Sequence, residues 1–349
     1  MSKTNFFDNI VKKAGNELAS KAADGLETDV VEWVDTGSYS LNALLSGSIH
    51  KGMPSNKIVA LAGEESTGKT FYALSIAKHF LETNPKGAVV YFETEGAVST
   101  DMLKQRGIDL NRFFVIPVAT IQEFRTQCVK IVDEYLVTPK SERQPMFMVL
   151  DSLGMLSTAK EVADIGEGKD TRDMTRAQLI RGTFRVLSLK LARANVPMLI
   201  TNHTYEVVGA YVPTKEMSGG GGLKYAASII VFLRKSKKRD GSDNEITGAI
   251  ITAKLDKSRL TVEYKEVETL LDHQTGIHKY YGVLDFMESQ GAVKRISKKV
   301  ELPGGASAFE SVVYKNPDKY FTKEVLEAAE VAANKEFLYG SAKPTDGKA

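Results

Sequence analysis

The chain is poor in the features that mark secreted and membrane proteins. Its 349 residues include one cysteine, Cys128, which excludes a disulfide framework and indicates a reducing compartment. No stretch approaches the roughly 18 consecutive apolar residues of a membrane span. Lys and Asp interrupt the first 22 residues, where a secretory signal would be apolar. These absences predict a soluble, cytoplasmic protein that acts without a membrane.

An excess of charge of either sign is also missing. Lys and Arg together number 46 and Asp and Glu 44, so the net charge is +2. A balanced chain has no global attraction to nucleic acid, and any polyanion site must be a local concentration of basic groups. With 42% apolar residues, the chain is long enough to bury an α/β core and to carry small appendages.

The most specific motif is a phosphate-binding loop. It matches G-x-x-x-x-G-K-[ST], with the apolar run Lys57–Ala62 before it and a helical pattern after it. Backbone N–H groups of such a loop surround a phosphate, Lys69 brings charge to the β- and γ-phosphates, and Thr70 offers its hydroxyl to Mg²⁺. The motif predicts a nucleotide site with Mg²⁺. Its eight residues are Gly63, Glu64, Glu65, Ser66, Thr67, Gly68, Lys69 and Thr70.

The apolar pattern divides the chain into three regions. Residues 1–30 form an N-terminal arm with too few apolar groups to fold alone, so its apolar stripe must pack on its own core or on a neighbouring subunit. Residues 31–282 alternate β-rich runs with helical segments, which predicts an α/β core with a mostly parallel sheet covered by helices. Residues 283–349 form a small C-terminal region, with a helix over Lys323–Phe337 and a disordered end from Ser341.

Seven apolar runs form the predicted sheet. They are Ile58–Ala62, Val89–Phe92, Phe114–Pro117, Phe147–Asp151, Met198–Asn202, Ile229–Leu233 and Ile246–Ala253. The connections of the last three are short and charged, which predicts antiparallel hairpins at one edge of the sheet.

Carboxylates follow two of these strands. Asp151 ends one apolar run, and Glu93 and Glu95 end another, where strand alternation points both side chains the same way. In doubly wound sheets ligands bind at the carboxyl ends of strands. Asp151 is therefore expected on the metal side of the loop beside Thr70, and one of the two glutamates can activate a water against the γ-phosphate.

Two loops and a histidine belong to the same edge of the sheet. His203 ends a strand, where it is either a structural hydrogen-bonding residue or a sensor of the γ-phosphate. The segment Ser157–Asp173 has no apolar periodicity, and Thr204–Lys215 leads into a glycine-rich stretch, so both are expected to be surface loops. Together they indicate one contiguous binding surface.

Basic residues gather close to these loops. Arg172 and Arg176 are one helical turn apart, and so are Arg181 and Arg185. The densest basic cluster, Arg234–Arg239, is either a solvated hairpin tip or a second polyanion surface.

The order of these motifs resembles that of the RecA-type recombinases. The phosphate-binding loop, the strand before Glu95, Leu150–Ser152, Thr201–Thr204 and Ser218–Ser228 occur in the family's order, and the resemblance covers roughly residues 30–285. Three short segments resemble the bacteriophage UvsX branch more than bacterial RecA. They are Asp173–Ala177, Asn202–Glu206 and Gly241–Asp243.

The resemblance implies an ATP-dependent DNA strand-exchange protein that acts in recombination, repair and recombination-dependent replication. Such a protein forms helical filaments on single-stranded DNA, binds ATP and Mg²⁺ between adjacent subunits and pairs with homologous duplex DNA. A single-strand-binding protein and a recombination mediator are the further implied partners. For a protein of phage origin, the compartment is the cytoplasm of the bacterial host.

The resemblance also implies roles for single residues. Lys69 and Thr70 bind phosphate and Mg²⁺, Asp151 supports the metal, Glu95 orients the attacking water, and His203 couples the γ-phosphate to the DNA-binding loops. Those two loops correspond to residues 157–172 and 205–217. Arg185, Gly219 and Gly220 match DNA-contacting positions of the family, and the basic residues in and beside the first loop, Lys169, Arg172 and Arg176, are predicted to bind DNA with them.

At some positions the chain departs from the family or leaves a choice open. Met102 stands where the family usually has a tyrosine that stacks on adenine, and Gly221 replaces an asparagine of the second loop. Lys257 resembles a lysine that reaches a neighbour's ATP, with Lys254 or Arg259 as the second basic group.

Two other functions compete with the recombinase. A hexameric helicase or motor of the same fold would close into a ring, whereas a recombinase filament stays open. A non-hydrolysing, ATP-gated scaffold is disfavoured by Glu95 in the water-activating position. No N-K-x-D signature follows a strand at a suitable distance, which disfavours a GTPase.

Overall fold

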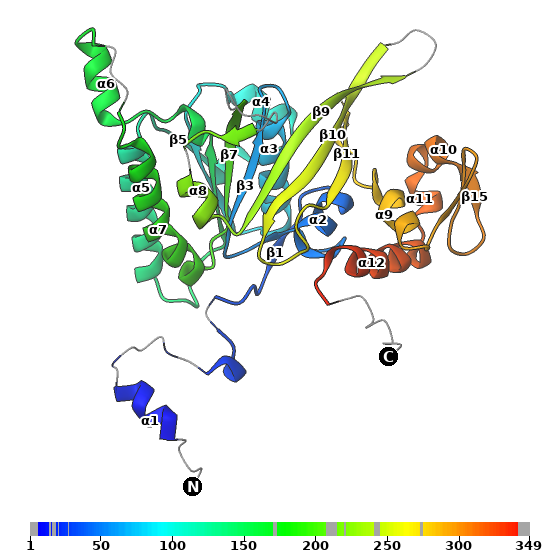
Figure 1. The fold of residues 1–349 in the computed structure, drawn as a ribbon, viewed down its shortest axis with the longest axis horizontal. Coiled ribbons are helices and arrows are strands. Elements are labelled where there is room, and N and C mark those ends of the chain that lie inside the picture. Colours follow the sequence, from blue (N-terminus) through cyan, green and yellow to red (C-terminus); the bar gives the residue numbers. More distant parts are fainter. Residues whose placement is uncertain are drawn as a thin grey trace, which may run out of the picture.

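The computed structural model places ten strands in one sheet through the middle of the protein (Figure 1). It describes residues 6–13, 15, 19, 21–26, 28–169, 173–206, 215–219, 221–240, 245–272 and 275–340. The strands of the sheet are β3 (Ile58–Gly63), β4 (Ala88–Glu93), β5 (Phe113–Pro117), β6 (Met146–Asp151), β7 (Met198–Glu206), β8 (Lys215–Met217), β9 (Ile229–Asp240), β10 (Glu245–Ser258), β11 (Glu266–Asp272) and β12 (Gly276–Ile277). Their order is β12-β11-β10-β9-β3-β7-β6-β4-β5, with β8 paired to β7.

In the part of this order from β9 to β5, each strand is parallel to the next. Their carboxyl ends therefore meet at one edge, where Gly63 of β3 lies opposite His203 of β7 and Glu93 of β4 opposite Asp151 of β6. This register brings the polar strand ends predicted from the sequence to one place.

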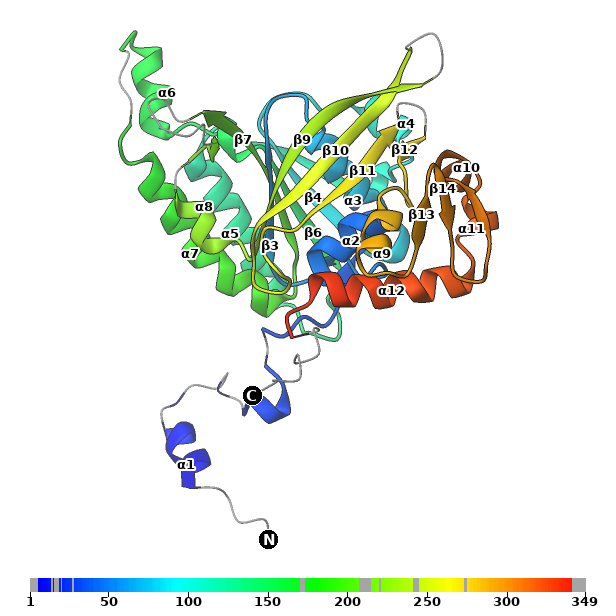
Figure 2. The same cartoon turned by 45° about the vertical axis from the view of Figure 1, so that its right-hand side comes forward.

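The antiparallel part of the sheet differs from the prediction in its strands. β9 and β10 form the expected hairpin, which projects beyond the other strands, and β11 pairs with β10 (Figure 2). The prediction was wrong for Met198–Asn202, because this run is part of β7 in the parallel centre, between β3 and β6. Both faces of a central strand are buried, so its apolar run cannot reveal its direction.

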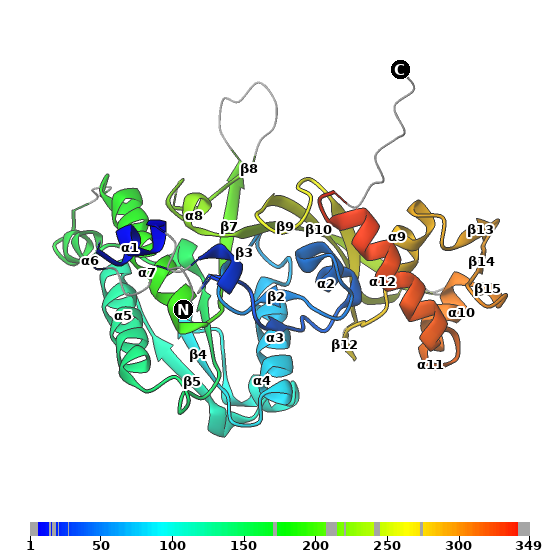
Figure 3. The same ribbon diagram turned by 90° about the horizontal axis from the view of Figure 1, so that it is seen from below.

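Helices cover both faces of the sheet (Figure 3). On one face α2 (Tyr39–Ser46), α3 (Lys69–Thr83) and α4 (Thr100–Gln105) share an apolar layer with Val59 and Leu61 of β3. On the other face α5 (Ile121–Val137) and α7 (Arg176–Ala194) share an apolar layer with the alternate residues Ala60 and Ala62. The period of two along β3 thus divides the core into two apolar layers, which confirms the predicted α/β architecture.

The N-terminal arm contains α1 (Phe6–Lys13), which stands apart from the sheet (Figure 1). The side chains of Ile10 and Val11 are 50% and 47% exposed. A linker with the short 3-10 helix η1 (Ala22–Asp24) leads from α1 to the core, where Lys57 Nζ donates a hydrogen bond to the carbonyl of Thr28 at 2.5 Å. A two-stranded ribbon, β1 (Trp33–Val34) with β2 (Met53–Pro54), follows it.

The C-terminal region packs on the α2 and α3 face of the core. Its elements are α9 (Val283–Ser289), β13 (Lys294–Ile296), β14 (Lys299–Glu301), β15 (Ser307–Phe309), α10 (Glu310–Lys315), α11 (Pro317–Tyr320) and α12 (Lys323–Phe337). The bounds of α12 confirm the predicted helix. Ala329 and Phe337 of α12 are buried in the same apolar layer as α3, and the backbone N–H of Ile49 donates to Glu330 Oε2 at 2.8 Å. Residues 341–349, predicted to be disordered, lie outside the described part.

None of the helices among the described residues is long and apolar enough to cross a membrane.

Candidate nucleotide and DNA-binding site

The phosphate-binding loop joins β3 to α3, as its motif requires. Gly68, at the N-terminus of α3, has a left-handed backbone with φ of 93°. A Cβ atom at Gly63 would lie 2.7 Å from Thr67 Oγ1 and 2.9 Å from the carbonyl oxygen of Leu233. A side chain at either glycine would therefore change the path of the loop.

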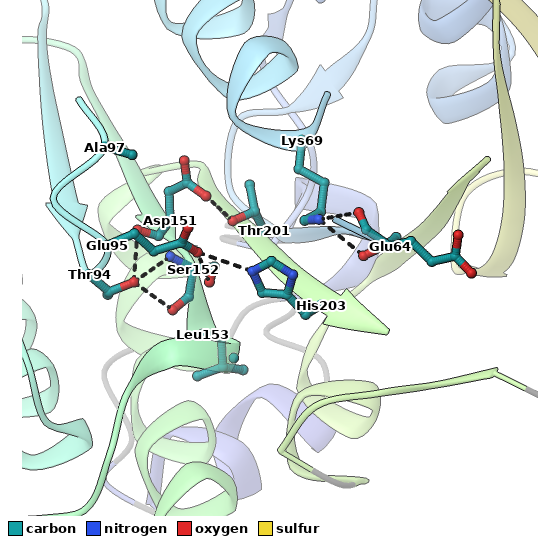
Figure 4. Close-up of polar contacts among 12 residues, drawn as sticks. Glu64, Lys69, Thr94, Glu95, Ala97, Asp151, Ser152, Leu153, Thr201 and His203 are labelled. Atoms are coloured by element: carbon teal, nitrogen blue, oxygen red, sulfur yellow. Dashed lines mark hydrogen bonds and ion pairs between the residues drawn. The ribbon is translucent and has the colours of Figure 1, made fainter. Parts of the chain in front are cut away.

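Lys69 lies over this loop. Its Nζ donates to the carbonyls of Gly63 at 3.0 Å and Glu64 at 2.7 Å (Figure 4). Burial lowers the pKa of Lys69, and the negative charges of Asp151 and Glu95 only partly oppose that shift. The arrangement holds one ammonium group where the loop would meet a phosphate.

Asp151 is buried at the end of β6, on the same face of the sheet as α3. Tyr91 Oη donates to its Oδ2 at 2.5 Å, and Thr201 Oγ1 donates to its Oδ1. Figure 4 shows the Asp151 carboxylate beside Thr201, with Lys69 on the far side of that threonine. The predicted carboxylate therefore reaches the neighbourhood of the phosphate-binding loop.

The two glutamates after β4 have different surroundings. Glu93 is buried, and its carboxylate accepts the backbone N–H groups of Glu95, Gly96 and Ala97 at 3.1, 2.8 and 2.9 Å. β4 ends at Glu93, so strand alternation does not extend to Glu95, and the two carboxylates have different hydrogen-bond partners. Glu93 stabilises the turn that presents Glu95.

Glu95 faces two polar side chains from neighbouring strand ends. Its Oε1 accepts a hydrogen bond from Ser152 Oγ at 2.7 Å and lies 3.1 Å from His203 Nε2 (Figure 4). Burial would raise the pKa of Glu95, but the hydrogen bonds from Ser152 and His203 and the charge of Lys69 outweigh it and lower this pKa. Glu95 is thus held as a carboxylate, and His203 connects it to β7.

The first expected loop contains a helix that we did not predict. α6 (Ala159–Gly166) begins with a capping box, in which Thr158 Oγ1 accepts from the N–H of Glu161 at 3.1 Å and Glu161 Oε2 from the N–H of Thr158 at 2.8 Å. The T-x-x-E spacing of these two residues was the sequence signal. Ile165 of α6 is 70% exposed, so the helix carries an apolar side chain into solvent.

The second expected loop begins and ends as a β-hairpin. β7 continues to Glu206 and pairs with β8, so that Thr204 lies opposite Met217 and Glu206 opposite Lys215. Lys215 also forms an ion pair with Glu64 of the phosphate-binding loop. The hairpin therefore touches the nucleotide side of the site through both of its strands, at His203 and at Lys215.

The residues expected to contact DNA have unequal surroundings. Arg176 donates hydrogen bonds to the carbonyls of Leu153, Gly154 and Leu156, at 3.4, 3.0 and 3.2 Å, so its guanidinium holds the turn after β6, which contains the 3-10 helix η3 (Leu153–Met155). Lys169 is exposed and pairs with Glu167 at 2.5 Å.

Arg185 and Gly219 lie near the second loop. Arg185 is exposed on α7 and lines a surface pocket of about 460 Å³ with residues of α8 (Gly221–Ala226) and Arg259. Gly219 has φ of 87°, and a Cβ atom there would lie 2.7 Å from Ile180 Cδ1. Arg172 and Gly220 lie outside the described residues. Of the basic cluster on β9, Arg234 and Lys235 are exposed along the strand, before the turn of the hairpin.

Lys257 is too far from the phosphate-binding loop of its own chain to act there. It lies opposite Ile230 of β9, whereas Gly63 lies opposite Leu233, which puts them roughly 10 Å apart along the strands and about as far across them. Its Nζ donates to the carbonyls of Lys224 and Tyr225 at the end of α8, at 2.6 and 3.4 Å.

Arg259 and Lys254, the two candidates for a second basic group beside Lys257, have different positions, and Met102 packs against the core. Arg259 Nη2 donates to the carbonyl of Tyr225 at 3.4 Å, so Arg259 shares a surface with Lys257, whereas Lys254 lies in the middle of β10. Met102 of α4 is half-buried and packs on the core layer of α3. Sequence reasoning missed Tyr91, because nothing in an apolar run marks one aromatic residue as the partner of a distant carboxylate.

Comparison with known proteins relates the chain to DNA recombination. The model of the RecA N-terminal domain matches residues 4–278. A recombination and repair protein of Enterobacteria phage T4 is 30% identical over 284 residues, which are 81% of this chain and 70% of that protein. A mitochondrial DNA repair protein, a RecA homologue of Dictyostelium discoideum, is 26% identical over 294 residues, which are 84% of this chain and 61% of that protein. The RecA protein of Mycoplasmopsis pulmonis is 28% identical over 279 residues, 80% of this chain and 77% of that protein.

Proposed function

The chain belongs to the RecA family and is a RecA-type recombinase, and on that premise we propose that it hydrolyses ATP with Mg²⁺ and assembles as a helical filament on single-stranded DNA. Proteins of this family are DNA-dependent ATPases. The names of its relatives, which refer to recombination, repair and RecA, do not favour the hexameric helicase. The observation that carries the proposal is the contact between Glu95 and His203, which joins a carboxylate of the nucleotide site to the strand of the DNA-binding hairpin.

The residues around the loop suit a nucleotide with Mg²⁺. We assign the phosphates to the loop N–H groups and Lys69, and the metal to Thr70 and Asp151, whose oxygen atoms are the ligands a hard cation prefers. No group of three His, Cys, Asp or Glu side chains among the described residues could hold a metal alone. Mg²⁺ would therefore take its other ligands from phosphate and water, and it would neutralise phosphate charge.

Glu95 is the residue assigned to the attacking water. Its lowered pKa keeps it ionised at neutral pH, so it can orient a water molecule and accept its proton. His203 is the coupling residue, because its imidazole touches Glu95 while its backbone belongs to β7, which leads into the second DNA-binding loop. Nucleotide binding and the position of that loop are thereby linked in both directions.

DNA binding is assigned to the surface formed by α6, the β7–β8 hairpin and the exposed side of α7. Lys169 and Arg185 bring charge to it, while Arg176 supports it from within through its bonds to backbone carbonyls. Bases are then read by pairing with homologous duplex DNA, and the protein needs mainly phosphate contacts. A single-strand-binding protein and a recombination mediator are the expected partners, in the cytoplasm of a bacterial host.

The ATP site is completed by a second copy in this proposal. Lys257 and Arg259 reach the nucleotide of the adjacent subunit, and the apolar side of α1 packs on a neighbour.

The direct test is electron microscopy of the full chain with a non-hydrolysable ATP analogue, with and without single-stranded DNA. We expect helical filaments of indefinite length that require the analogue and lengthen with DNA. Closed rings of fixed subunit number under both conditions would instead support the helicase.

A further inference from the structure

The Asp151 carboxylate has two hydroxyl donors to which the sequence analysis assigns no role. Tyr91 Oη donates to Oδ2 at 2.5 Å and Thr201 Oγ1 donates to Oδ1. Asp151 is 6% exposed and Thr201 and Tyr91 are fully buried, so water does not replace these bonds. Within the described part of the chain, these two hydroxyls are the hydrogen-bond donors to its side chain.

The donors come from the two strands on either side of β6. The order β7-β6-β4 puts Asp151 on the middle strand, with Thr201 on one neighbour and Tyr91 on the other. Rotation about the last torsion of an aspartate side chain is soft, because that torsion has broad minima. One donor on each oxygen, anchored in separate strands, restricts this rotation.

The donors leave the carboxylate available for further contacts. A carboxylate has about four acceptor positions, two on each oxygen, and each hydroxyl takes one of them. Both hydroxyls are neutral, so the negative charge remains for a cation.

We propose that Tyr91 and Thr201 are positioning residues that fix the Asp151 carboxylate in the orientation in which it supports the nucleotide-bound metal. This inference rests on the proposed role of Asp151. Neither residue touches nucleotide or metal in our assignment, and both act through the carboxylate. Loss of either hydroxyl leaves the charge in place but frees its orientation, so the site should need more Mg²⁺ to bind the same nucleotide.

The test replaces each hydroxyl without changing the packing. For Tyr91→Phe and Thr201→Val, we would titrate Mg²⁺ at equilibrium and measure the concentration that gives half-maximal binding of a fluorescent ATP analogue. Partners of metal-supporting groups affect metal affinity by about 10-fold or more, so we expect roughly a 10-fold rise in that concentration for each variant. Binding of the analogue at saturating Mg²⁺ should approach the parental level.

The chain provides matched controls. Tyr72 and Thr269 form another buried hydroxyl pair in the core layer of α3, joining α3 to β11 and away from Asp151. Tyr72→Phe and Thr269→Val thus remove the same atoms from the same layer, and their Mg²⁺ requirement should stay within about 2-fold of the parent. If the Tyr91 and Thr201 variants show only the shift of these controls, the positioning role is overturned.

Asp151→Asn separates this inference from the proposed function. If Asp151→Asn raises the Mg²⁺ requirement while Tyr91→Phe and Thr201→Val match their controls, only the positioning role fails. If Asp151→Asn leaves the Mg²⁺ requirement unchanged, Asp151 does not support the metal, so its assigned role and the positioning role are both wrong. Thermal unfolding of each variant shows whether it is folded. If Tyr91→Phe does not fold, Thr201→Val alone tests the positioning role.

Discussion

The charged side chains at the two edges of the parallel sheet differ in how many contacts they make within their own chain. At the carboxyl edge, Asp151, Glu93 and Glu95 are each engaged by side chains or N–H groups of their own chain. At the opposite edge, Lys257 and Arg259 donate hydrogen bonds to backbone carbonyls at the end of α8, and Arg259 also donates its backbone N–H to the carbonyl of Ser228. In our proposal, the carboxyl edge is the preformed half of the ATP site, and the opposite edge completes the ATP site of a second subunit.

The largest expected effect comes from the preformed edge. Glu95→Gln keeps the shape of the side chain but loses the proton acceptor, so ATP turnover should fall by about 10²–10⁴-fold while the nucleotide remains bound. Steady-state hydrolysis and equilibrium binding of a fluorescent analogue measure the two quantities. Glu93→Gln is the control, since its carboxylate serves backbone N–H groups, and it should lose stability more than turnover. Parental turnover in Glu95→Gln would remove Glu95 from the mechanism.

The opposite edge is tested by mixing two inactive variants. Lys69→Ala should abolish hydrolysis in the nucleotide site of the subunit that carries it. Lys257→Ala should abolish hydrolysis in the nucleotide site of the adjacent subunit. In an equal mixture roughly a quarter of the junctions would combine an intact Lys69 with an intact Lys257, so about that share of ATPase activity should return. No recovery, in filaments shown by sedimentation to contain both variants, would mean that Lys257 does not act across a subunit junction.

An intermediate effect is expected at His203, where the carboxyl edge meets the β7–β8 hairpin. His203→Ala should leave basal ATP binding in place but abolish the stimulation of hydrolysis by DNA, a loss of about 1–3 kcal/mol of coupling. By linkage, the ATP analogue should then no longer tighten binding to single-stranded DNA. Parallel rate and affinity measurements decide the matter, because unchanged stimulation together with unchanged tightening would make His203 a structural residue.

The smallest effect concerns the ion pair between Glu64 and Lys215. Both side chains are about half-exposed, at 59% and 45%, so screening limits the pair to about 0.2–1 kcal/mol. Glu64→Lys and Lys215→Glu should each weaken the analogue-induced gain in DNA affinity by up to about 5-fold, and the double exchange should recover part of it. Equal effects at 50 mM and 500 mM salt would argue against an ion pair.

Local patterns were enough to predict a large part of this molecule. The phosphate-binding loop, the strand that ends at Asp151 and the helix over Lys323–Phe337 each depend on residues close in the sequence, whereas the strand predicted to end at His203 continues to Glu206. The motif defines the turn, the apolar period defines the element, and parallel strands bring their ends to one edge. Helix α6 could have been predicted too, because its capping box is equally local.

Only the tertiary structure decided which side chains meet across strands. Tyr91 and Thr201 reach Asp151 over 60 and 50 residues of sequence, and Lys215 reaches Glu64 over 151. These contacts depend on the order of the strands in the sheet and on which face each residue takes. An apolar run buried on both faces encodes neither its neighbours nor its direction, because burial is favourable in any order. The packing of the two helical layers selects one order, and that order makes Glu95, Asp151 and His203 parts of one site.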